Sequence, residues 1–95
     1  MAGASGEVIE VVLGEFVLRL DGTVVEVLHR TGLCHRFHVS HVAVEATPTA
    51  DGGLKVRLGI DVDGTILNGD RLEVPPFQVA AVTALFQEAV ARRGT

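Results

Sequence analysis

The stretch PPFQVAAVTALFQEAVARR, from Pro75 to Arg93, decides which fold this chain can adopt. Its two prolines end a strand and begin a helix predicted at about 76–93, because proline lacks an amide hydrogen and its fixed φ suits a first helical turn. Apolar residues recur along one side of this helix with the helical period. The predicted buried stripe contains Val79, Val82, Phe86, Ala89 and Val90, with Leu85 on its border. One terminal helix can cover only one open sheet or barrel mouth, so strands followed by a helix indicate the architecture.

The residues before this helix form short β-branched runs separated by turn dipeptides, including Asp21-Gly22, Asp63-Gly64 and Asn68-Gly69. Such dipeptides connect antiparallel strands, because their residues accept the positive φ that tight hairpin turns require. We predict seven strands between Phe16 and Val74, at 16–20, 24–28, 34–39, 42–46, 54–60, 65–67 and 71–74. Residues Glu7 to Leu13 either extend the first strand past Gly14 or add an edge strand.

The length of 95 residues predicts a single domain, at 7–95. Residues 1–6, Met-Ala-Gly-Ala-Ser-Gly, are expected to form a disordered leader before it. Four Phe and no Trp or Tyr mean that the core is built mainly from Val, Leu and Ile, a composition that favours strands. Neither a signal peptide nor a membrane span is expected near the N-terminus, because Glu7, Glu10 and Glu15 interrupt its apolar stretch.

The formal charge of −4 disfavours nucleic acids and anionic membranes as partners, since both require clustered basic side chains. The adjacent pair Arg92-Arg93 is expected to offset the helix dipole in the last turn. A single cysteine, Cys34, excludes an internal disulfide framework and is consistent with a cytoplasmic protein.

The element order resembles the pleckstrin-homology-like (PH-like) superfold, including its small bacterial members. The resemblance covers residues 15–93, and the stretch RFHVSHVAV from Arg36 to Val44 looks like the third strand, short turn and fourth strand of that family. It implies a mainly β protein, a seven-stranded antiparallel barrel or sandwich capped by one C-terminal α-helix. The superfold hosts lipid-binding, peptide-binding, protein-binding and self-associating modules, so the resemblance does not select one function.

Two features of that family can be compared with this sequence. Its phosphoinositide-binding members carry basic residues around the first loop, whereas here Asp21-Gly22-Thr23 has only Arg19 before it, which argues against a lipid headgroup site. Its peptide-binding members add a strand beside the fifth strand, in a groove against the C-terminal helix. We expect Leu54–Ile60 and the helix to offer such a groove.

The stretch GIDVDGTIL, from Gly59 to Leu67, resembles the first motif of haloacid-dehalogenase-like phosphatases. In that reading Asp61 is the nucleophile and Asp63 the acid/base, with Mg²⁺ beside them. That fold requires further strands with crossover helices of about 10 to 12 residues or more each, and only about 28 residues follow Leu67. A hairpin turn at Asp63-Gly64 is therefore the favoured interpretation, with a phosphate-handling or metal-dependent enzyme as the alternative.

Histidines and the cysteine form a second candidate site within the His29–His41 segment: His29, Cys34, His35, His38 and His41. Strand alternation places these side chains on different faces, and the spacing lacks the paired ligands typical of zinc sites. We predict no metal and no cofactor. If the turn at Thr31-Gly32 sets His29 opposite His35, two protonated imidazoles would repel each other below pH about 6.5.

These observations favour a non-catalytic module that binds a protein partner or forms a homo-oligomer, with no nucleic acid and no membrane. The apolar segment Val8–Leu13 looks like an edge strand that seeks a partner, and an alanine strip lies off the buried stripe of the helix. The candidate partner-binding residues are Val8, Val12, Lys55, Arg57, Ala80, Ala84 and Ala91.

Overall fold

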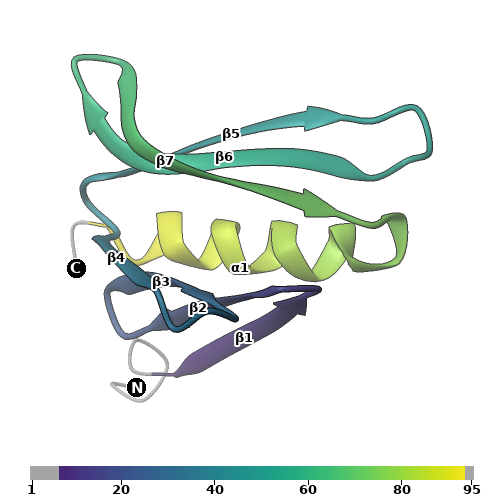
Figure 1. Cartoon of the computed structure of the whole chain (residues 1–95). Coiled ribbons are helices and arrows are strands. Elements are labelled where there is room, and N and C mark those ends of the chain that lie inside the picture. The colour runs from purple at the N-terminus through teal and green to yellow at the C-terminus, as the bar shows by residue number, and fades with distance from the viewer. Residues whose placement is uncertain (1–6, 94–95) are drawn as a thin grey trace.

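The computed structural model describes residues 7–93, apart from the side chain of Asn68, so the predicted leader at 1–6 lies outside the described residues. Seven strands precede the helices in this part of the chain (Figure 1). They are β1 (Val8–Leu13), β2 (Phe16–Asp21), β3 (Val24–His29), β4 (Cys34–His38), β5 (Val42–Pro48), β6 (Leu54–Val62) and β7 (Thr65–Val74). A 3-10 turn, η2 (Pro76–Gln78), leads into α1 (Val79–Ala91), which confirms the mainly β fold with one C-terminal α-helix.

The strands form two antiparallel sheets, one in the order β1-β2-β3-β4 and one in the order β5-β6-β7. The described ladders leave free strands at the edges of both sheets, so a closed seven-stranded barrel is not confirmed. Residues Val8–Leu13 are a separate edge strand, one of the two alternatives that the sequence left open.

The prediction of a hairpin turn at Asn68-Gly69 is wrong, because β7 runs without interruption from Thr65 to Val74. The register shifts here: Leu58 pairs with Asp70, but Ile60 pairs with Leu67. One residue of β6, Gly59, thus faces two residues of β7, which is the geometry of a β-bulge. A Cβ on Gly59 would collide with the Leu67 carbonyl oxygen and would lie 2.8 Å from Ile66 Cγ2, so only glycine fits this close approach.

The core lies between the two sheets, and α1 lies between them in Figure 1. Leu18, Leu20, Val25, Val56 and Leu58 are among its fully buried side chains. On α1 the buried residues are Val82, Leu85 and Ala89. Leu85 therefore occupies the centre of the buried face, where the sequence placed only its border, and Val90 is 55% exposed instead of buried.

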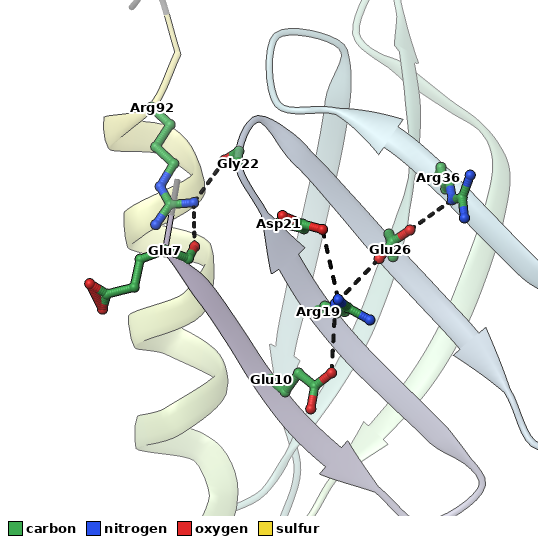
Figure 2. A network of polar contacts seen from close by, with 8 residues as sticks. All are labelled: Glu7, Glu10, Arg19, Asp21, Gly22, Glu26, Arg36 and Arg92. Atoms are coloured by element: carbon green, nitrogen blue, oxygen red, sulfur yellow. Dashed lines mark hydrogen bonds and ion pairs between the residues drawn. The ribbon is translucent and has the colours of Figure 1, made fainter. Parts of the chain in front are cut away.

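Two arginines fasten the C-terminal end of α1 to the sheets. Arg92 is only 3% exposed, and its Nη1 donates to the carbonyl oxygens of Glu7 at 2.9 Å and Gly22 at 2.7 Å (Figure 2). Arg93 donates through Nε to Val39 O and through Nη2 to Val42 O, both at 2.8 Å. The prediction that this pair lies in the last helical turn is wrong, because α1 ends at Ala91 without a basic residue in its last turn, and both arginines bind backbone carbonyls of other elements.

Neither helix in the described residues combines the length and apolar character that a membrane span requires.

Candidate protein-interaction surfaces

The free edge of β5 offers unpaired backbone groups. Ladder bonds at its ends, Asp61 N to His41 O at 2.8 Å and Thr49 N to Gly53 O at 3.0 Å, show which residues face β6. Backbone bonding alternates along an antiparallel strand, so the N–H and C=O groups of Val44 and Ala46 point away from β6. No other strand pairs with this edge within residues 7–93. Two alternate residues, Val44 and Ala46, therefore have backbone groups free to bond an added strand.

Both ends of this edge are bounded. The carbonyl of Val42 is already bound by Arg93, and Pro48 has no N–H to donate. Between them, Val44 is 36% exposed and Ala46 is exposed, although their side chains lie on the same sheet face as the buried Val42. The edge therefore combines four open backbone groups with apolar side chains that are only partly covered.

Two hollows follow the same strand. One of about 1280 Å³ includes Glu45 and Thr47 of β5 among its lining residues and extends to the β1–β2 turn and Gln78. A second of about 610 Å³ is lined by Val42 to Glu45, by Arg93 and by the β6–β7 hairpin. The two hollows together follow β5 from Val42 to Thr47.

The edge of β1, in contrast, is bordered by α1. Gln78 Nε2 donates to Val12 O at 2.6 Å, and Arg92 donates to Glu7 O at the other end of the strand. Covering an edge with a helix is a common protection against unwanted pairing. Val8 and Val12 remain 45% and 61% exposed, but their side chains alternate with buried Val11 and so lie on the outer face of the sheet.

The other candidate residues lie on two further surfaces. Lys55 and Arg57 are exposed on the outer face of β6, opposite the buried Val56 and Leu58. Because β6 is the central strand of its sheet, it has no free edge for a peptide, and the expected groove beside Leu54–Ile60 is replaced by the edge of β5. Ala80, Ala84 and Ala91 are exposed on α1. The structure therefore does not bring the seven predicted residues together.

Asp61 and Asp63 lie at the β6–β7 hairpin, as the turn interpretation predicted. Asp61 Oδ1 accepts a hydrogen bond from Gly64 N at 3.0 Å. Asp63 and Gly64 have φ values of 51° and 83°, which a type I′ hairpin turn requires at its two central residues. The Asp61 carboxylate thus supports the turn.

The predicted contact between His29 and His35 is wrong, because His35 pairs with Val27 and Cys34 pairs with Leu28. His29 instead contacts the ring of Phe16 edge to face, at 4.6 Å between centroids. His35 Nδ1 lies 2.8 Å from Asp70 Oδ2, a contact that joins β4 to β7. Within residues 7–93 no three His, Cys, Asp or Glu side chains are grouped so that they could hold a metal ion. Cys34 is exposed.

Sequence reasoning recognised β5 as a strand but not as an open edge. The signal that could have found it is Pro48 at the end of this strand, since proline is excluded from the interior of sheets. The pairing order itself leaves no local mark in the sequence.

No protein-family model, curated protein or solved structure matches this chain.

Proposed function

We propose that the protein is a non-catalytic, cytoplasmic interaction module that binds an extended segment of a protein partner at the free edge of β5. The observation that carries this proposal is the pair of residues Val44 and Ala46, whose backbone groups point away from β6 beside partly covered apolar side chains. Strand addition of this kind derives affinity from main-chain hydrogen bonds and specificity from alternate side chains.

A PH-like fold is part of the proposal. Seven antiparallel strands followed by a C-terminal helix are the element order that the resemblance implies, although the first of them is β1, so that Arg36–Val44 spans β4 and β5 and not a third and fourth strand. Peptide-binding members of that superfold receive a strand beside their fifth strand, next to the helix. Here α1 is fastened near the start of β5 through Arg93, which supports the same placement.

Ala46→Pro is the variant that tests this function. Its N–H points away from β6, so proline removes one bond to the added strand without removing a ladder bond. Peptides are first selected on the wild-type protein from a phage-displayed library of random dodecapeptides. Ala46→Pro should weaken their binding at least tenfold, whereas Ala46→Ser should bind as the wild type does. Equal binding by a folded Ala46→Pro variant would contradict the proposal.

Self-association through α1 is a second candidate, favoured by Phe77, which is 85% exposed beside the exposed Ala80 and Ala84. An antiparallel pair of helices centred on Ala84 would place Phe77 opposite Ala91 of the second copy, a large side chain against a small one. Light scattering over a range of concentrations tests this. A dimer that Phe77→Ser dissociates supports it, and a monomer at all concentrations contradicts it.

A further inference from the structure

Charged side chains alternate in sign across the outer face of the four-stranded sheet. The ladder register places Glu10, Arg19, Glu26 and Arg36 in one row, one residue from each strand. Arg19 Nε lies 3.6 Å from carboxylate oxygens of Glu10 and Glu26, and Arg36 Nε donates to Glu26 Oε2 at 2.7 Å (Figure 2). Directly opposed charges stabilise a pair of strands when their signs differ. The row ends at β4 with a positive charge.

The side chain of Arg36 lies on the edge strand β4 and is largely exposed to solvent. Its side chain is 71% exposed, its Nε donates to Glu26 Oε2, and Cys34 on the same strand is its other side-chain partner. Guanidinium groups favour planar contacts with carboxylates at both of their edges. The hydrogen bond and the charge of Glu26 also raise the pKa of Arg36 further, so the group is a cation at every relevant pH.

The backbone of β4 is open on the same side. His29 N donates to Leu33 O at 2.7 Å and Val39 N to Thr23 O at 2.8 Å, so residues of that parity face β3. By the same alternation, the N–H and C=O groups of Cys34 and Arg36 face away from β3. No strand pairs with this edge in the described chain. A second extended segment could therefore bond to this sheet.

We propose that the free edge of β4 binds an extended acidic segment of a protein partner, with an Asp or Glu directly opposite Arg36. This site lies on the other sheet from the β5 edge and favours the opposite charge in its ligand, because the charged residue on the outer face of β5 is Glu45. It is therefore independent of the proposed function. The charge row supplies its specificity: an acidic residue continues the alternation, and a basic residue breaks it.

The cross-strand row that ends at Cys34 indicates a second residue of the bound segment. Val12, Val17, Leu28 and Cys34 pair in sequence across the sheet, and Leu33 beside them is 63% exposed. An antiparallel segment passes Arg36 first and Cys34 two residues later. The segment thus has an acidic residue followed, two positions on, by an apolar residue.

Two labelled decapeptides test this proposal by fluorescence anisotropy with the full chain. Both alternate Thr and Val; one has Glu at its centre and the other has Lys there. The Glu peptide should bind about fivefold more tightly, and Arg36→Glu should reverse the order, as expected for exchanging a favourable cross-strand charge pair for a repulsive one. Arg71→Glu, at an exposed arginine on the other sheet, is the matched control and should leave the order unchanged.

Amide chemical shifts locate the bound segment, and Arg36→Gln serves as a second variant that should abolish the preference without a new charge. Shifts at Cys34 and Arg36 are expected. The proposal is overturned if the two peptides bind equally, if folded Arg36→Glu keeps the original order, or if only Val44 and Ala46 shift. Pairing of this edge with a second copy of the chain, seen as Arg36-dependent dimerisation without peptide, would also overturn it.

Discussion

Arg92 shows how much one residue contributes when its charge is buried. Its guanidinium group joins the end of α1 to the start of β1 and to the β2–β3 turn. Removing a buried charged donor leaves both carbonyls without that partner, at about 1.5 to 3 kcal/mol for each hydrogen bond. Arg92→Met should therefore lower the free energy of unfolding by about 3 kcal/mol in urea titrations. The exposed Arg71→Met should change it little, and equal losses in both variants would contradict this role.

Gly59 is required by the bulge between β6 and β7. Gly59→Ala forces a Cβ into the Leu67 carbonyl and should destabilise the protein by about 1 to 3 kcal/mol through overpacking. Gly69→Ala is the control across the ladder, since its Cβ would meet no atom closer than 3.4 Å. Thermal unfolding of both variants measures the difference, and a neutral Gly59→Ala would show that β7 does not approach this closely.

Asp51 makes the turn between β5 and β6 sensitive to acid. Hydrogen bonds from the Thr49 hydroxyl and then from Gly53 N hold the pKa of this exposed carboxylate below its ordinary value of 3.8. A lowered folded-state pKa stabilises the protein above pH 3.8 and loses that contribution as pH falls through the folded value. Asp51→Asn should thus flatten the pH dependence of the melting temperature below pH 4. An unchanged acid slope would contradict this.

At the scale of elements, the buried face of α1 is centred on Leu85 and does not include Val90. Leu85 is fully buried and Val90 is 55% exposed, although the helical period alone placed Val90 in the stripe and Leu85 beside it. Leu85→Ala should destabilise by about 2 to 5 kcal/mol, as core truncations do. Val90→Ala should cost less than about 0.5 kcal/mol, because it lies away from the core. Urea titrations measure the free energy of unfolding of both variants. A larger loss of stability in Val90→Ala than in Leu85→Ala would contradict the assignment of the buried face of α1.

The strands and the helix could be read from the sequence because alternation and turn dipeptides are local. Asp63-Gly64 behaved as predicted, with both residues at positive φ. Asn68-Gly69 did not, because an Asn-Gly pair suits a bulge as well as a turn, and the long-range pairing with Gly59 decides between them. The burial of Arg92 was also beyond prediction, since its acceptors are carbonyls 70 and 85 residues away in the chain.

At the scale of the whole molecule, the sequence predicted strands followed by a helix but not the separation into sheets of four and three strands. Sheet order depends on which distant strands meet, and so the open edges of β4 and β5 could not be identified from residue patterns alone. Val8 and Val12 were predicted as an open edge because an apolar run has the same pattern whether or not a helix borders it. Gln78, which donates to that edge at Val12 O, lies far along the chain.

Hydrogen exchange of the β5 amides, followed by NMR with and without a selected peptide, tests the central claim most directly. In the free protein, Ala43, Glu45 and Thr47 should exchange slowly because their amides bond to β6, whereas Val44 and Ala46 should exchange quickly. Saturating peptide should slow exchange at Val44 and Ala46 by at least tenfold. Peptide that binds while these two amides stay fast would contradict strand addition at this edge.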